Sequence, residues 1–304
     1  MRNTFAEEIT ILAKKNKKIV LLSGDIGNRL FDKFRKIHKN RFYNCGIAEA
    51  SMTGVASGLA YSGLLPITYT ITPFNTMRCL EQIKLDVCYP NLPMVIVGTG
   101  SGLSYASLGS THHSLEDISI LRSIPNISIF CPSDPNEVKS LLKESLKIKG
   151  PVYMRIGRGG STETEKLFKL KRNTLVKSGS EGVIICTGPT VILANTISKI
   201  LKEKYKKKIA VLSIHTIKPI ETKSILSISK KVKNVFVIEE HQMIGGLRDI
   251  ISNILNSNQI KLKNYKSFGI DDKFCSYNGS YEGIKKEYKL SEKFLSQKIL
   301  SYLK

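Results

Sequence analysis

The stretch MTGVASGLAYSGLLPITYTI, residues 52–71, contains the two elements from which the fold can be predicted. Small and apolar residues over 52–63, with Gly54 and Gly58 four positions apart, are typical of a helix that packs closely against a neighbour. The run over 65–71 is apolar and rich in β-branched residues, which is typical of a buried strand. Buried strands joined by helices indicate a parallel sheet that is covered on both faces.

The same alternation of strand and helix signals extends along the first half of the chain. Buried strands are expected over 18–24, 65–71, 93–100, 127–133 and 152–157, and helices over 75–88, 114–122 and 134–147. Asp134, directly after the PSDP turn, is a candidate N-cap for the last of these helices.

The second half of the chain begins after a polar segment. Residues 159–180 have glycines at both ends and little periodicity, which is typical of a linker. After it, strands are expected over 182–188, 208–214 and 234–240, and helices near 190–204, 221–231, 246–257 and 279–303. We therefore predict an α/β protein with two mainly parallel sheets: a first domain over 1–160, a linker over 161–180 and a smaller second domain over 181–304.

The composition is that of an ordinary globular protein, with 41% hydrophobic and 24% charged residues. No apolar run approaches the roughly 18 residues that a membrane span requires. The start, MRNTFAEEIT, lacks the apolar segment of a secretory signal. The six cysteines include no CxxC pair and are expected to be reduced thiols. We therefore expect a cytoplasmic protein that does not contact a membrane.

The formal net charge of +22 raises the question of a nucleic-acid partner. The lysines, however, are spread along the chain, as in KKNKK (14–18) and KEKYKKK (202–208), with no interleaved aromatic residues. Charge that is spread in this way is typical of a solvated surface. We therefore expect no nucleic-acid partner.

A single glutamate, Glu49, stands among small and apolar residues in NCGIAEASM (44–52). One explanation is an acid in the first turn of a helix, where the helix dipole favours negative charge. The other explanation is catalysis, because an apolar environment favours the protonated form of a carboxyl group and lets it exchange a proton near neutral pH. Both explanations remain open from these residues alone.

Two adjacent histidines, His112 and His113, occur in LGSTHHSLED (108–117). They lie on a glycine-rich loop after an expected strand, at the edge of the sheet where α/β proteins bind ligands. Glu116 and Asp117 nearby make a metal site conceivable. Adjacent histidines rarely face one point, so we expect an imidazole that binds substrate or acts in catalysis, and no metal ligand on this chain.

Two arginines, Arg155 and Arg158, flank glycines in RIGRGG (155–160). The segment is a solvated turn or an anion site, since guanidinium groups bind phosphate well. The segment EEHQMIGG (239–246) indicates a tight turn between a strand and a helix. The chain contains no GxGxxG pattern with an acidic partner, so dinucleotide binding has little support.

Taken in order, seven motifs resemble the carboxyl-terminal half of a transketolase, which consists of a pyrimidine-binding domain and a C-terminal domain. The resemblance covers nearly the whole chain and is strongest to the split transketolases, whose two halves are separate polypeptides. The motifs are SGDIG (23–27), CGIAEASM (45–52), FNTMRCLEQIK (74–84), GSTHHSLEDISILRSIPN (109–126), CPSDPNE (131–137), KPIE (218–221) and EEHQMIGGL (239–247).

The resemblance implies a role for Glu49. In transketolases the glutamate of the GIAE motif hydrogen-bonds the aminopyrimidine ring of thiamine diphosphate and promotes removal of the thiazolium C2 proton. Phe74 matches an aromatic residue that stacks on this ring, and Ile71 stands where many members have a second one. The further residues that the resemblance places at the cofactor are Asp25, Ile26 and Arg78.

The resemblance also implies a substrate site. His112 matches a histidine that contacts substrate hydroxyls and is a candidate catalytic residue. Arg158 and Arg2 match arginines that bind substrate phosphate, and Arg155 is a further candidate. Leu108 stands where many transketolases have an aspartate, and Gly100 stands near the position of a histidine, so the choice of sugar is expected to differ.

The resemblance finally implies a partner chain. The diphosphate and Mg²⁺ of the cofactor are held by a GDG-to-Asn motif in the other half of a transketolase, and this chain contains no GDG. We therefore expect an N-terminal transketolase subunit as partner, in an α2β2 assembly that acts on sugars or sugar phosphates. The helix over 52–63 is the expected interface, and ordinary packing against the sheet is the alternative.

Three other functions fit less well. The β subunit of a 2-oxoacid dehydrogenase E1 component shares the fold and the glutamate, but STHH and LEDISILR favour a transketolase. A fragment similar to 1-deoxyxylulose 5-phosphate synthase is conceivable, although that family keeps both halves in one chain. A basic interaction domain without enzymatic activity would require all seven motifs to be accidental.

Overall fold

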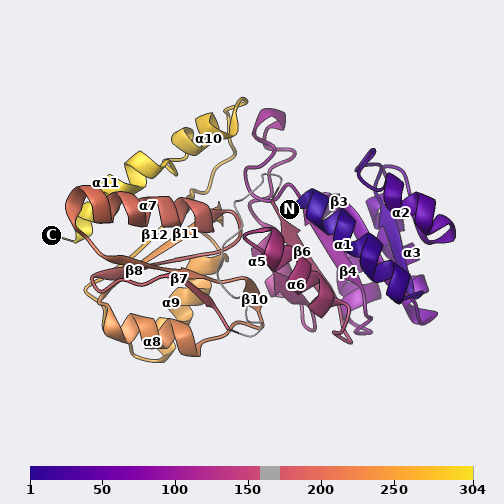
Figure 1. The fold of residues 1–304 in the computed structure, drawn as a ribbon, viewed down its shortest axis with the longest axis horizontal. Helices are drawn as coiled ribbons and strands as arrows, with labels where there is room; N and C mark the ends of the chain where they lie inside the picture. Colours follow the sequence, from indigo (N-terminus) through magenta and orange to yellow (C-terminus); the bar gives the residue numbers. More distant parts are fainter. Residues whose placement is uncertain (158–171, 304) are drawn as a thin grey trace.

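The computed structural model describes residues 1–157 and 172–303. It contains two mainly parallel sheets, and each sheet is covered by helices (Figure 1). The prediction of a two-domain α/β fold is therefore confirmed.

The first sheet has seven strands in the order β10-β5-β6-β4-β3-β1-β2, and all neighbours are parallel except β10 and β5. Runs of valine, isoleucine and leucine make its central strands, which are buried on both faces as expected for a covered parallel sheet. The strands are β1 (Ile19–Ser23), β2 (Phe42–Asn44), β3 (Leu65–Ile71), β4 (Val95–Thr99), β5 (Ser128–Phe130), β6 (Val152–Ile156) and β10 (Thr216–Lys218).

Helices cover both faces of this sheet. One face is covered by α1 (Arg2–Lys15), α2 (Asp32–Ile37) and α6 (Pro135–Ser145). The opposite face is covered by α3 (Glu49–Tyr61), the short turns η2 (Met77–Cys79), α4 (Leu80–Gln82) and η3 (Ile83–Cys88), and α5 (Asp117–Arg122). Two further turns are η1 (Lys39–Arg41) and η4 (Ala106–Leu108).

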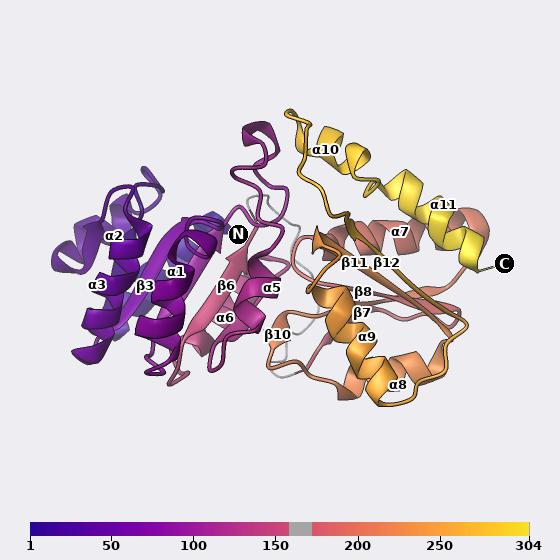
Figure 2. The ribbon, with the colours of Figure 1, turned by 180° about the vertical axis from the view of Figure 1, so that it is seen from behind.

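The second sheet has five strands in the order β12-β11-β8-β9-β7. They are β7 (Thr174–Lys177), β8 (Gly182–Cys186), β9 (Ile209–Ser213), β11 (Asn234–Gln242) and β12 (Asn264–Ile270). One face is covered by α7 (Thr190–Tyr205), α10 (Tyr281–Glu287) and α11 (Glu292–Tyr302), and the other by α8 (Lys223–Lys231) and α9 (Leu247–Ser257) (Figure 2).

The structure corrects two expectations about the elements. The predicted linker over 161–180 is wrong in its last part, because β7 lies there and pairs antiparallel with β9. β7 is a half-exposed edge strand, so it lacks the apolar run that marks a buried strand. The single helix expected over 279–303 is two helices, because Lys289 has a left-handed φ of +57° and Ser291 caps α11 by accepting the Phe294 N–H at 3.4 Å.

The expected N-cap at Asp134 is confirmed, since its side chain accepts the backbone N–H of Glu137 at 2.9 Å. Within residues 1–157 and 172–303, no helix combines the length and the apolar character that crossing a bilayer requires.

Candidate active site

The candidate site lies at the carboxyl edge of the first sheet. Strands β1, β3 and β4 are parallel neighbours, so the loops that follow them emerge at one edge. These loops carry Asp25 and Ile26 after β1, Phe74 and Arg78 after β3, and His112 after β4. Ligands in open parallel sheets bind at this edge.

Glu49 is the first residue of α3 and is 2% exposed. Its place in the first turn suits the helix dipole, as the sequence allowed. Its Oε2 lies 2.8 Å from a guanidinium nitrogen of Arg78. A Cβ on Gly24, directly after β1, would lie 3.3 Å from Cγ of Glu49, so the backbone after β1 runs beside this carboxyl group.

Arg78 connects the Glu49 carboxylate with the ring of Phe74, which in turn contacts the ring of His112. Its guanidinium carbon lies 4.1 Å from the centre of the Phe74 ring, within cation–π range. The Phe74 ring lies 5.1 Å from the His112 imidazole, edge to face at 70°. Glu49, Arg78, Phe74 and His112 thus form one continuous row, which we call the edge row.

The two histidines have different environments. His112 is half-buried, and its Nδ1 lies 2.9 Å from Oγ1 of Thr111, which fixes the orientation of the ring. His113 is 4% exposed, and burial lowers the pKa of its imidazole. His112 therefore belongs to the edge row and His113 to the interior. In the described residues no three histidine, cysteine or acidic side chains form a group able to hold a metal.

The remaining residues expected at the cofactor lie along the same edge. Asp25 has a left-handed φ of +54°, and its Oδ1 accepts a hydrogen bond from Nδ2 of Asn44 at 2.9 Å. Ile26 and Ile71 are half-buried at the ends of β1 and β3. They place apolar side chains next to the edge row, Ile26 from the loop after β1 and Ile71 from the last position of β3.

Arg155 does not belong to the site. Its side chain is 2% exposed and pairs through Nε with Oδ2 of Asp117 at 2.7 Å. Burial by itself disfavours both charges, but the pairing outweighs it: the Asp117 carboxylate raises the pKa of the Arg155 guanidinium, and the guanidinium lowers the pKa of Asp117. The expectation that Arg155 binds substrate is therefore wrong: Arg155 lies on the buried strand β6, and its side chain is occupied by Asp117 and by the Glu240 carbonyl of the second domain. Arg158 lies outside the described residues.

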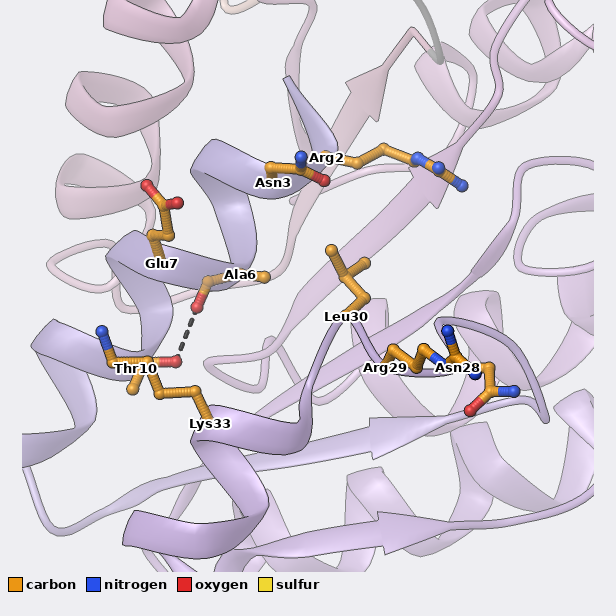
Figure 3. A pocket seen from close by; sticks show the side chains of 9 residues that line it. All are labelled: Arg2, Asn3, Ala6, Glu7, Thr10, Asn28, Arg29, Leu30 and Lys33. Atoms are coloured by element: carbon orange, nitrogen blue, oxygen red, sulfur yellow. Dashed lines mark hydrogen bonds between the residues drawn. The ribbon is translucent and has the colours of Figure 1, made fainter.

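Arg2 lines a pocket of about 460 Å³ between α1 and the loop after β1 (Figure 3). Arg29 and Lys33 enter the pocket from the opposite side, with Glu7 as the acidic residue in its lining. Arg29 has a left-handed φ of +63° and is exposed. The balance of charge in this pocket favours an anion. Leu108 is 47% exposed on the loop that carries His112.

Sequence reasoning missed three of these features. The ion pair between Glu49 and Arg78 joins residues 29 positions apart, and no local pattern reports such a contact. Arg29 and Lys33 were not expected beside Arg2, although three cations close to a strand end could have signalled an anion site.

Two protein-family models match the chain. Residues 1–162 match the transketolase pyrimidine-binding domain, and residues 171–292 match the transketolase C-terminal domain.

Individual relatives agree with these models. A subunit of the apulose-4-phosphate transketolase of Phocaeicola vulgatus is 32% identical over 100% of this chain and 97% of its own. The 1-deoxy-D-xylulose-5-phosphate synthase of Halothermothrix orenii is 31% identical over 90% of this chain, which covers 43% of that protein. A solved structure described as a split gene transketolase in an inactive beta4 tetramer is 28% identical, with a TM-score of 0.88 over 99% of this chain and 97% of its own.

Proposed function

The chain belongs to the transketolase family and corresponds to its carboxyl-terminal half, and from this premise we propose that it is one subunit of a two-chain, thiamine-diphosphate-dependent transketolase. The enzyme transfers a two-carbon ketol unit between sugars. The observation that carries the proposal is the edge row, with a buried glutamate at the start of α3 next to an arginine, an aromatic ring and an imidazole.

The edge row fits the pyrimidine half of thiamine diphosphate. An aminopyrimidine ring is flat and apolar on its faces, which suits the ring of Phe74 and the side chains of Ile26 and Ile71. Its ring nitrogen needs one partner that can share a proton, and Glu49 is that partner. Asp25 and Arg78 lie at the same edge of the sheet. When bound, thiamine diphosphate supplies the nucleophilic carbon and the electron sink for breaking a C–C bond beside a carbonyl group.

Glu49 would hold the proton that it shares with the pyrimidine nitrogen of bound thiamine diphosphate. Its burial keeps bulk water away from the shared proton, and α3 holds the carboxyl group in a fixed position. A guanidinium nitrogen of Arg78 donates to Oε2 at 2.8 Å and fixes the orientation of the carboxyl group. We infer that Arg78 holds the carboxyl group in the position where it would meet the pyrimidine ring.

His112 orients the sugar substrate. Thr111 holds its Nδ1, so that the other ring nitrogen is available to a substrate hydroxyl group. The pocket around Arg2 lies at the same edge of the sheet and suits the phosphate of a sugar phosphate. Arg158 remains a candidate for the same role.

A partner chain with the diphosphate-binding domain completes the proposed enzyme. Diphosphate and Mg²⁺ are held there, and two copies of each chain form an α2β2 assembly. The relative from Phocaeicola vulgatus, which is named as one subunit of a transketolase, and the solved inactive beta4 tetramer support this division of labour. Neither describes the substrates of this chain.

The outer surface of α3 suits the interface with this partner. A Cβ on Gly54 or on Gly58 would meet no atom within 4 Å, so these glycines face away from the sheet. Of the sixteen large apolar side chains exposed in the described part of the chain, six lie beside or on α3 and the neighbouring segment 77–89: Ile47, Val55, Tyr61, Met77, Leu85 and Tyr89. Ser57 Oγ donates to the Asp86 carbonyl at 2.8 Å and joins these two segments.

Reconstitution tests the proposal. The chain is mixed with the diphosphate-domain chain of the same genome, thiamine diphosphate and Mg²⁺, and two-carbon transfer from a ketose phosphate to an aldose phosphate is followed. Activity that requires both chains is the expected result. A lone chain that transfers the unit at the rate of the mixture would contradict the two-chain proposal, and an inactive mixture that binds the cofactor would contradict the reaction.

A further inference from the structure

The loop that carries His112 is closed at its base by a pair of residues. Gly102 and Ser114 form an isolated antiparallel bridge, with backbone N–H···O distances of 3.2 and 3.0 Å in the two directions. Everything between them, including His112, projects from this bridge. The position of His112 therefore depends on what holds the bridge.

Glu240, on β11 of the second domain, holds one side of the bridge. It is 4% exposed, and its Oε2 accepts the backbone N–H of Leu103 at 3.2 Å. Its Oε1 accepts a hydrogen bond from the Tyr281 hydroxyl group. A Cβ on Gly102 would lie 2.5 Å from Oε2, and Gly102 also has a φ of +62°, so glycine is required for this approach.

Arg155 holds the other side. Its Nη2 donates to the carbonyl oxygens of Ser114 and Glu240, both at 3.0 Å. Its Nε donates to Asp117, which also accepts the Tyr153 hydroxyl group at 2.6 Å. Because Arg155 and Asp117 are both almost fully buried, this pair has a fixed geometry.

The tip of the loop also contacts the second domain. Ser110 Oγ donates to the Cys275 carbonyl at 2.9 Å, and a Cβ on Gly109 would lie 2.7 Å from Oδ1 of Asn278. Both views show the tip beside the segment that leads into α10 (Figures 1 and 2). The loop is thus held by the second domain at its base and at its tip.

We propose that Glu240 is a positioning residue for the transfer reaction: it clamps the loop to the second domain so that His112 faces Phe74 before substrate binds. This inference rests on the proposed role of His112. Ordering a loop costs conformational entropy, and a group that is already in place at binding avoids that cost during the reaction. The second domain, which contributes no residue to the edge row, acquires a function through this clamp.

Replacement of Glu240 tests the clamp in the reconstituted two-chain enzyme. Glu240→Ala removes the acceptor for Leu103 and Tyr281, and we expect kcat to fall about 10–100-fold with a smaller change in KM, since misplacement of about 1 Å has effects of this size. Glu240→Gln keeps an acceptor oxygen and should restore most of the rate. In a His112→Ala background, Glu240→Ala should cost less than about threefold more, because the two changes then act on one group.

Amide hydrogen exchange measures whether the loop is held in place, and it does so independently of enzymatic activity. Amide exchange of a peptide covering 103–114 should be faster in Glu240→Ala than in the wild type, while a peptide covering α3 should be unchanged. Glu239→Ala is the matched control. Glu239 is the neighbouring buried glutamate, but it accepts the backbone N–H groups of Leu247 and Arg248 at the start of α9 and does not bond the loop.

These measurements separate the possible failures. Unchanged exchange of 103–114 in Glu240→Ala, or a full multiplicative loss of rate in the His112→Ala background, would overturn the clamp. Faster exchange of the loop in a complex that transfers no ketol unit would retain the clamp and reject the proposed function. If Glu240→Ala does not fold, Tyr281→Phe replaces it and should give the same changes with smaller amplitude.

Discussion

The proposed proton sharing between Glu49 and the cofactor depends on one buried carboxyl group. Glu49→Gln keeps the shape but cannot exchange a proton with a ring nitrogen. We expect exchange of the cofactor C2 proton, followed by NMR in the reconstituted complex, to slow by about 10²–10⁴-fold.

A matched control for this substitution is Glu144→Gln, which changes a partly exposed glutamate of α6 that pairs with Lys147, just after the helix. It should leave proton exchange unchanged. Near-normal exchange in Glu49→Gln would remove the glutamate from the mechanism.

The neighbouring histidines offer an internal comparison. His112→Ala should lower kcat/KM for ketol transfer more than His113→Ala, because only His112 reaches Phe74. His113→Ala should instead lower the melting temperature more, since it leaves a cavity in the interior. Steady-state kinetics and calorimetry on both variants test this; the opposite ranking in kinetics would assign the site to His113.

We expect Arg2 to favour phosphorylated acceptors over acceptors without a phosphate. Arg2→Ala removes a cation from the pocket in Figure 3 and should raise KM for a phosphorylated acceptor about tenfold or more, since a charge-assisted hydrogen bond contributes about 1.5–3 kcal/mol. For the same sugar without its phosphate, KM should change little. An equal increase for both acceptors would mean that Arg2 acts on the fold and not on the phosphate.

At the scale of elements, the outer face of α3 at Gly54 and Gly58 meets no other atoms of residues 1–157 and 172–303 within 4 Å of an added Cβ. Gly58→Ala should raise the melting temperature of the lone chain, because alanine is favoured over glycine in a helix by about 1 kcal/mol and the new Cβ meets open space. Gly58→Leu should weaken binding to the partner chain, as measured by calorimetry.

Lys199→Leu, on an exposed face of α7, is the control for this pair of variants. It adds the same apolar side chain at a distance from α3 and should leave partner binding unchanged. Equal binding by Gly58→Leu and the wild type would place the interface elsewhere.

Glu239, a titrating group on β11, accepts the backbone N–H groups of Leu247 and Arg248 at the start of helix α9. Burial raises the pKa of Glu239 to about 7, against hydrogen bonds from Leu247 and Arg248 that lower it. Arg155 on β6 also lowers this pKa and Asp249 on α9 raises it. In the unfolded chain the reference pKa is 4.5, so the folded protein binds more protons between pH 4.5 and 7. The stabilisation is therefore complete below pH 4.5 and is lost as the pH rises through 7.

Glu239→Gln removes this pH dependence. Relative to the variant, the wild type should lose about 2–3 kcal/mol of unfolding free energy between pH 5 and pH 8, on the order expected for a shift of this size. Glu137, whose pKa burial also raises to about 7, is present in both proteins and cancels in the comparison. Denaturant titrations across this pH range test the sign; a constant difference between the two proteins would contradict it.

How far the sequence predicts these elements depends on burial. Strands such as β1, β4 and β8 are apolar runs, and their composition alone identifies them. β7 and β10 are short edge strands that are stabilised by pairing, so their sequence carries little signal. The same holds at the candidate site: motifs pointed to Glu49 and His112, which the structure places in one row, whereas the burial of Arg155 includes a contact with Glu240, 85 residues further along the chain.

For the whole molecule, a single apolar cluster extends across the domain boundary. It runs from Met52 on α3 through Ile118 on α5 to Ile225 on α8 and Ile251 on α9. Together with Arg155 and Glu240, it joins the half of the chain that carries the edge row to the half that holds the loop. The two domains therefore share one apolar core.

Strand β10 has a consequence for the order in which the protein is made. It is encoded within the second domain, yet it completes the first sheet by pairing with β5, where the Cys131 N–H donates to the His215 carbonyl at 2.8 Å. During synthesis on the ribosome, strand β5 of the first sheet lacks its β10 partner until residue 218 has emerged. A chain cut between the two domains would leave β5 without this partner permanently. Unpaired strand edges can pair with strands of other chains. Chains cut at this position by natural or engineered recombination are therefore expected to aggregate more than the intact chain, which light scattering would show.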